Sequence, residues 1–109
     1  MIVDLRIYTT WPNKMAEFVA LYEAKAWPLQ LQYLENCLGW YTTVEGPLNS
    51  VVHMWGYTDQ GERERRRNAM AADPAWGEYL AALGTRGLLV KMENRIVKPT
   101  SFFAAHKAK

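Results

Sequence analysis

The stretch GWYTTVEGPLNSVVHMWGY, residues 39–57, decides the fold because it contains two strands and the turn that joins them. On each side of the Gly46-Pro47-Leu48-Asn49 segment, side chains alternate with the period of two that is typical of a β-strand. The residue types of this segment favour a turn of hairpin length. The stretch therefore predicts an antiparallel hairpin with strands at residues 39–44 and 50–57.

A strand and a helix flank this hairpin on each side. Residues 2–9 alternate like a strand, and from Lys14 onward apolar residues recur at the spacing of one helical face. After the hairpin, Asp59 marks the start of a helix, and Asp73-Pro74 marks the start of its second piece. A last strand is predicted over residues 88–97. The order β-α-β-β-α-β predicts an α+β, ferredoxin-like domain, in which both helices cover one face of a four-stranded antiparallel sheet.

The size and composition of the chain fit one small domain. We assign residues 1–99 to this domain and residues 100–109 to a C-terminal tail. The net charge of +2 gives no reason to expect nucleic acid or an anionic membrane as a partner. No apolar run approaches the roughly 20 residues that cross a bilayer. Because strand-like residues follow Met1 directly, we expect no targeting segment and a cytoplasmic location.

Strand parity predicts two faces of different character. The residues expected beneath the helices are Val3, Leu5, Ile7, Trp40, Val44, Val52, Met54, Leu88, Val90 and Met92. The residues expected on the helix-free face are Arg6, Tyr8, Tyr41, Thr43, His53, Trp55, Tyr57, Lys91, Glu93 and Arg95. Exposed aromatic rings need cover and buried ions need partners. We therefore expect a homodimer in which two sheets pack face to face and enclose a polar-lined cavity in each half.

A candidate site follows from this arrangement. In the expected strand order the first strand lies between the third and the fourth, so Arg6 would lie near His53 and pair with Glu93. His53, whose ordinary pKa is near neutrality, is the candidate proton carrier, and Arg6 would hold an oxyanion. The candidate substrate-binding residues are Tyr8, Tyr41, Trp55, Tyr57 and Glu93. Three interpretations stay open: a structural ion pair, a binding site for a small molecule, and a catalytic site.

Two arginines of the predicted second helix belong to the same picture. Arg63 and Arg67 stand four residues apart and therefore share a helix face. We expect them to reach a neighbouring carboxylate or the rim of the cavity, whereas Arg65 points elsewhere.

The sequence predicts neither a metal nor a cofactor. His53 and His106 are isolated from other ligand-type residues, and Cys37 is the single cysteine. The chain also lacks a glycine-rich phosphate loop.

Several motifs, taken in order, are similar to those of the NIPSNAP proteins, and the chain resembles this family over nearly its whole length. The motifs are Leu5-Arg6-Ile7-Tyr8, Gly46-Pro47-Leu48-Asn49, Val52-His53-Met54-Trp55-Gly56-Tyr57, Glu62-Arg63 with Arg67, Asp73-Pro74-Ala75-Trp76, Glu93-Asn94 and Pro99-Thr100. The resemblance implies a dimeric α+β barrel, a short bacterial member, and no settled activity. The wider superfamily implies two alternatives, a cofactor-independent monooxygenase, isomerase or cyclase that uses His53 as acid or base, and a haem-handling protein.

Overall fold

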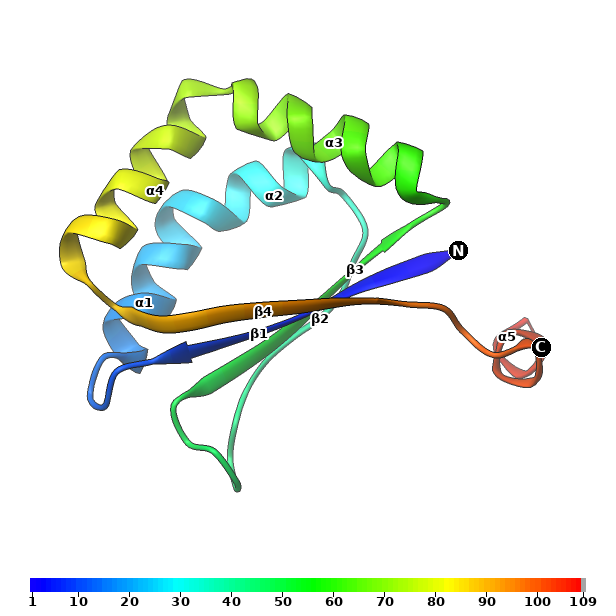
Figure 1. Ribbon diagram of the computed structural model, residues 1–109, viewed down its shortest axis with the longest axis horizontal. Helices are drawn as coiled ribbons and strands as arrows, with labels where there is room; N and C mark the ends of the chain where they lie inside the picture. Colours follow the sequence, from blue (N-terminus) through cyan, green and yellow to red (C-terminus); the bar gives the residue numbers. More distant parts are fainter. Residues whose placement is uncertain (109) are drawn as a thin grey trace.

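The computed structural model describes residues 1–108. Its four strands form one antiparallel sheet, and the helices of the two crossovers lie on one side of it (Figure 1). Its strand order is β2-β3-β1-β4, so β1 lies between the third and the fourth strand as expected. The strands are β1 (Ile2–Thr10), β2 (Cys37–Thr42), β3 (Ser50–Tyr57) and β4 (Leu89–Val97). The predicted α+β class and the ferredoxin-like order are confirmed.

The helices of the first crossover form one bent rod. It consists of α1 (Met15–Leu21), a π-helical turn η1 (Tyr22–Ala26) and α2 (Trp27–Tyr33). The N–H of Trp27 donates to the carbonyl of Tyr22, five residues earlier. The next residue, Pro28, has no N–H to continue the ordinary ladder, which explains why the hydrogen bonding changes at this point.

The second crossover holds α3 (Gln60–Ala72) and α4 (Pro74–Arg86). Asp59 begins α3 by accepting the N–H of Glu62 at 2.8 Å, and Asp73 begins α4 by accepting the N–H of Ala75 at 2.9 Å. Gly87 ends α4 in the left-handed conformation, with a φ of 59°. Within residues 1–108, no helix combines the length and the apolar character that crossing a membrane requires.

The predicted C-terminal tail contains a further helix, α5 (Ser101–Lys107), which the sequence analysis did not assign. Thr100 begins it by accepting the N–H of Phe103. Figure 1 shows α5 beyond the end of β4, away from the other helices. Its phenylalanines, Phe102 and Phe103, are exposed.

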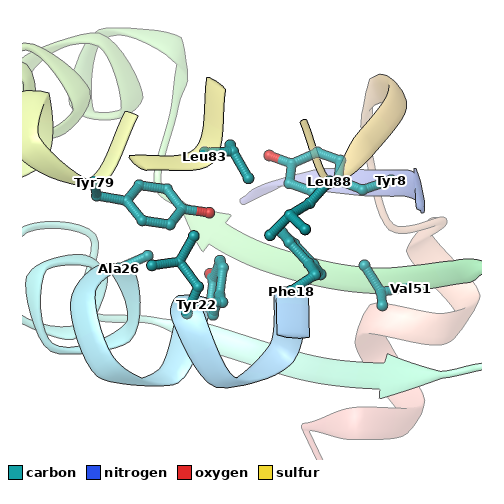
Figure 2. Close-up of a cluster of buried hydrophobic side chains, with 9 residues drawn as sticks. Tyr8, Phe18, Tyr22, Ala26, Val51, Tyr79, Leu83 and Leu88 are labelled. Atoms are coloured by element: carbon teal, nitrogen blue, oxygen red, sulfur yellow. The ribbon is translucent and has the colours of Figure 1, made fainter. Parts of the chain in front are cut away.

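The helices cover the face of β1 and β3 that the sequence analysis left open. Tyr8 and Val51 belong to the core with Phe18 of α1 (Figure 2). The ring of Trp55 lies 6.0 Å from that of Trp27 in α2. The aliphatic residues of these two strands, Val3, Leu5, Ile7, Val52 and Met54, are half-buried on the helix-free face. The predicted parity was wrong for β1 and β3. On β3, bulky aromatic rings rather than the smaller aliphatic side chains fill the space beneath the helices. On β1, Asp4 faces the helices because its hydrogen-bond donors come from α3 and β4.

The parity of β2, and that of β4 from Lys91 onward, was predicted correctly, but Val44 and Val90, also expected beneath the helices, are 86% and 45% exposed. Val44 lies beyond the end of β2, and a register shift opposite Thr9 and Thr10 packs Leu89 rather than Val90 against the core. Trp40 packs against Tyr22 with a ring separation of 4.8 Å, whereas Tyr41 is 54% exposed on the other face. On β4, Asn94 reaches the helix side, where it contacts Asp4. The core beneath the helices has two clusters: Tyr8, Phe18, Leu21, Tyr22, Ala26, Val51, Tyr79, Leu83 and Leu88 in one, and Leu34, Trp55, Tyr57 and Met70 in the other.

The start of α4 generates a stability prediction. The Asp73 carboxylate accepts both the Ala75 N–H and the Tyr33 hydroxyl, the latter at 2.7 Å. We expect Asp73→Ala to lower the free energy of unfolding by about 1 to 2 kcal/mol, as the loss of a helix cap does. Urea denaturation measures this change. The cost should shrink in a Tyr33→Phe background, where one of the two bonds is already gone; an equal cost in both backgrounds would contradict the paired role.

Candidate functional site

The centre of the candidate site is the carboxylate of Asp4, which is fully buried on β1. Its Oδ2 accepts hydrogen bonds from Nε and Nη2 of Arg6, at 3.2 and 3.1 Å, and from Nε of Arg63 on α3, at 2.9 Å. Its Oδ1 accepts one from Nδ2 of Asn94 on β4, at 3.1 Å. Burial alone would raise the pKa of this carboxyl, but the Arg6 charge and the three donors hold it below its ordinary value. Asp4 is therefore an anion.

The charges around Asp4 do not balance. Arg6, Arg63 and Arg67 surround one carboxylate, which leaves two positive charges uncompensated. Arg67, on the same face of α3 as Arg63, forms no ion pair within residues 1–108. Burial and the neighbouring Arg6 lower the pKa of Arg67. We call these three arginines together with Asp4 the basic cluster.

His53 is fully buried on β3, next to the basic cluster. Its Nδ1 accepts a hydrogen bond from Nε1 of Trp55 at 2.9 Å, so in the neutral ring the proton belongs on Nε2. Nε2 has no hydrogen-bond partner within residues 1–108. Burial, followed by the Arg6 charge, lowers the pKa of His53 to about 3. The residue is therefore a neutral hydrogen-bond donor, and the expectation that it titrates near neutrality was wrong.

Two tyrosine hydroxyls complete the polar groups of the site. The Tyr8 hydroxyl accepts a hydrogen bond from Nη1 of Arg6 at 3.0 Å. The Tyr57 hydroxyl is buried beside Arg67, which can only donate, so its own proton has no acceptor among residues 1–108. Burial raises the pKa of Tyr57, and the charge of nearby Arg67 partly opposes this effect. Apart from Asp4, whose oxygens are already occupied, the site presents mainly hydrogen-bond donors.

Aromatic rings hold His53 in place. Trp40 stacks on it with a ring separation of 5.2 Å and an interplanar angle of 23°. Tyr8 meets it edge-on at 4.8 Å, and Trp55 does so at 6.4 Å. The site therefore has an apolar wall beside its charged groups.

The structure brings together most of the predicted site residues and separates two of them. Arg6, Tyr8, His53, Trp55 and Tyr57 share the helix side of the sheet, not the helix-free side where the sequence analysis placed them. The other two, Tyr41 and Glu93, lie on the helix-free side.

The predicted Arg6–Glu93 pair does not form. The β4 residue opposite Arg6 is Asn94, and Glu93 lies opposite Ile7. A displacement of one residue along a strand moves a side chain to the other face of the sheet. Glu93 pairs instead with Lys91, at 3.7 Å.

Asp4 and Asn94 were not among the residues predicted for the site. Asp4 shares the strand parity of Arg6 and Tyr8, and this signal was available. The expectation for α3 is confirmed in part: Arg63 reaches a buried carboxylate, and Arg65 is exposed. Arg66 points elsewhere, to Glu35 and Glu62.

The basic cluster can be reached from solvent on the β4 side. The side chains of Arg6 and Arg63 keep 14% and 22% of their surface exposed, and Asn94 is exposed. The neighbouring β4 residues that face the helix side, Met92 and Ile96, are also exposed. No helix therefore seals this edge.

The motif order and the fold agree with a comparison across protein families. The sequence pattern that defines the NIPSNAP proteins matches residues 3–104, nearly the whole chain. The chain belongs to the NIPSNAP family. It is a family of unknown function, and its relatives bring no specific activity to this chain.

Individual proteins of this family are similar to the chain in sequence and in structure. Protein NipSnap homolog 3A of Homo sapiens is 31% identical over 93 residues, a match that covers 85% of this chain and 37% of that protein. This chain thus spans less than half the length of that relative. A NIPSNAP family protein from Agrobacterium tumefaciens is 38% identical with a TM-score of 0.86, and the match covers 93% of this chain and 94% of that one. An uncharacterized NIPSNAP-like domain protein from Burkholderia xenovorans is 42% identical with a TM-score of 0.84, over 93% and 86% of the two chains.

The neutral state of His53 generates a prediction about pH. Its pKa is about 3 in the folded chain and near 6.5 in an unfolded one, so between these values the unfolded chain binds more protons. Stability should therefore fall as the pH decreases below about 6.5. In His53→Gln this slope should largely disappear between about pH 6.5 and 5, as measured by urea denaturation at several pH values. His106→Gln is the matched control and should keep the slope; a wild-type slope in His53→Gln would contradict the assignment.

Proposed function

We propose that this NIPSNAP protein binds a small organic anion at the basic cluster. The observation that carries the proposal is the pair of uncompensated guanidinium charges next to two buried donors, His53 Nε2 and the Tyr57 hydroxyl, that have no acceptor within residues 1–108. A buried polar group without a partner costs about 1 to 3 kcal/mol. An anion would supply both the missing charge and the missing acceptors.

The residues favour a carboxylate or an enolate joined to an apolar body. Arginine matches the planar geometry of a carboxylate through paired N–H donors. The Tyr8, Trp40 and Trp55 rings around His53 offer apolar surface beside the charged groups. The interpretation as a structural ion pair explains Asp4 with Arg6 and Arg63. It does not explain Arg67, a half-buried guanidinium that forms no ion pair within residues 1–108.

A cofactor-independent enzyme is the alternative, with His53 in a changed role. With a proton on Nε2 and a Trp55 hydrogen bond at Nδ1, His53 has no free lone pair with which to act as a base. A neutral imidazole can instead donate its N–H to a developing oxyanion, and Arg6 can stabilise the same charge. This arrangement supports enolate or oxyanion chemistry better than proton transfer by His53.

The haem-handling alternative does not fit the residues. A haem iron takes an unprotonated ring nitrogen. The Trp55 hydrogen bond occupies Nδ1 of His53 and leaves the proton on Nε2, and the whole residue is buried. His106 is exposed on α5, apart from the basic cluster.

The helix-free face supports the proposal of a homodimer. Its central residues, Val3, Leu5, Ile7, Val52 and Met54, form an aliphatic surface across β1 and β3. A second copy of the same face would remove this surface from water, which is the packing expected for two sheets. These aliphatic residues suit an interface between subunits better than the charged residues predicted there, because they need no partners when they are buried.

Origin and location stay proposals as well. The likeness to bacterial chains of similar length supports a bacterial protein. A cytoplasmic location is the one expected from the sequence.

The anion proposal predicts a selective response to charge. At constant ionic strength, sodium benzoate should raise the melting temperature, whereas its neutral analogue benzamide should not. Arg67→Met keeps the apolar stem and removes the charge, so we expect it to weaken benzoate binding tenfold or more, as the loss of a charged hydrogen bond of about 1.5 to 3 kcal/mol does. Isothermal titration measures this loss.

The control is Arg65→Met, on the exposed side of α3, which should bind benzoate as the wild type does. Arg67→Met should not lower the melting temperature without ligand, because it removes repulsion from Arg6. A structural role would produce the reverse pattern, a lower melting temperature and unchanged binding. If acetate, benzoate and phosphate all leave the wild type unaffected, the proposal fails.

The dimer proposal predicts that one substitution on the helix-free face should reduce the molecular mass in solution from that of a dimer to that of a monomer. The wild type should sediment as a dimer at micromolar concentration, with an interface above roughly 1,200 Å². Leu5→Glu should give a monomer, because two carboxylates would be buried without partners. Leu80→Glu, an equivalent change at an exposed position of α4, should stay dimeric. A monomeric wild type would exclude this assembly.

A further inference from the structure

A pocket separate from the basic cluster lies between the bent helix and β2. Its lining residues are Val19, Tyr22, Glu23, Trp27 and Trp40. The cavity measures about 170 Å³, the volume of roughly five or six water molecules at about 30 Å³ each. Neither the Arg6–Asp4–Arg63 contacts nor the aliphatic face of the proposed dimer contributes to it.

Three aromatic side chains form most of this pocket, and other rings hold them in position. The Tyr22 and Trp40 rings lie 4.8 Å apart, inclined at 52°. Trp27 rests against Trp55, and Trp40 rests on His53. Rings fixed from behind can present their surfaces to a ligand without further ordering, which favours binding.

The π-helical turn accounts for the presence of Tyr22 and Trp27 in the lining of one pocket. In a regular α-helix, residues five apart point about 140° away from each other. A hydrogen bond that closes over five residues, as the one from Trp27 to Tyr22 does, brings them to nearly the same side. Single π-turns of this kind are frequent at functional sites.

One charged group stands among the lining residues. Glu23 is exposed and forms no ion pair within residues 1–108. No lysine or arginine lines the pocket. A negative charge beside aromatic rings repels anions and attracts cations.

We propose that this pocket is an aromatic cage for a trimethylammonium group. Ring faces attract a cation through their quadrupole, and tryptophan does so most strongly. A primary ammonium is strongly hydrated and needs an acceptor for each of its three N–H groups, whereas most of this lining is ring surface, with acceptors only at Glu23 and the Tyr22 hydroxyl. A trimethylammonium group carries its charge beneath methyl groups, so the rings cover it and Glu23 balances its charge. The cage shares the Trp40 ring with the proposed anion site, but the inference rests on none of that site's charged groups.

The test compares choline with 3,3-dimethylbutan-1-ol, its neutral carbon analogue of the same shape. Titrations of the whole protein are followed by the NMR signals of the Trp27 and Trp40 side chains, with potassium chloride holding the ionic strength constant. Choline should bind about tenfold more tightly than the neutral analogue, the factor expected for a partly desolvated cation–π contact.

Two substitutions test whether choline binds in this pocket. Glu23→Gln should weaken choline binding by roughly threefold to fivefold, the contribution of an exposed ion pair, and should leave the neutral analogue unaffected. Glu78→Gln, an exposed carboxylate on α4, is its control and should change nothing. Trp27→Phe should weaken choline binding further while it keeps an apolar ring in the core.

A second ligand, the amide of Nα-acetyl-trimethyl-lysine, shows which kind of molecule carries the trimethylammonium group. If choline binds more tightly, the natural ligand is a free metabolite. If the lysine derivative binds as tightly or more tightly, the natural ligand is a modified protein chain; both results support the cage. Equal or tighter binding of 3,3-dimethylbutan-1-ol would show a plain apolar pocket and overturn the proposal. Absence of choline-induced shifts in Trp27 and Trp40 would overturn it as well.

Discussion

The buried Asp4 carboxylate is the constraint on which the rest of the structure depends. A carboxylate removed from water needs several donors, because its desolvation otherwise costs several kcal/mol. Asp4 obtains them from Arg63, 59 positions away on α3, and from Asn94, 90 positions away on β4. One side chain thereby fixes the helix layer and the edge strand against β1. The aromatic core provides the area that stabilises the fold, but it does not by itself specify this arrangement.

The same constraint determines the character of the candidate site. Asp4 occupies Arg63 and part of Arg6, and it leaves Arg67 without a carboxylate. The Arg6 charge and burial keep His53 neutral, and Trp55 determines which of its ring nitrogens carries the proton. What remains is a set of donors held in position before any ligand arrives. Such a set stabilises an anion without reorganising when the anion binds.

The sequence predicts the elements of this fold well and its faces poorly. The alternating strands, the turn at residues 46–49 and the caps at Asp59 and Asp73 depend on local chemistry, which is visible in the sequence. The faces depend on which side chains the helices cover. Both sides of β3 are apolar, one through aromatic and one through aliphatic residues, so the period of two identifies this strand without orienting it. On β1 the aliphatic side faces away from the helices and the side of Asp4 and Arg6 faces them, because the donors of Asp4 come from α3 and β4.

The partner of Arg6 illustrates the consequence. Glu93 lies on the helix-free face, where it was predicted, but the parity of β1 is reversed, so Arg6 faces the helices opposite Asn94. Successive side chains of β1 point to opposite faces of the sheet, so Arg6 on the helix side has Leu5 and Ile7 on the helix-free side as its direct neighbours. In the proposed dimer, a second copy would hold those neighbours from one side while the helices hold Arg6 from the other. The donors would then project from a strand fixed on both faces, and the site would still open away from the interface, so a ligand could enter without separating the subunits.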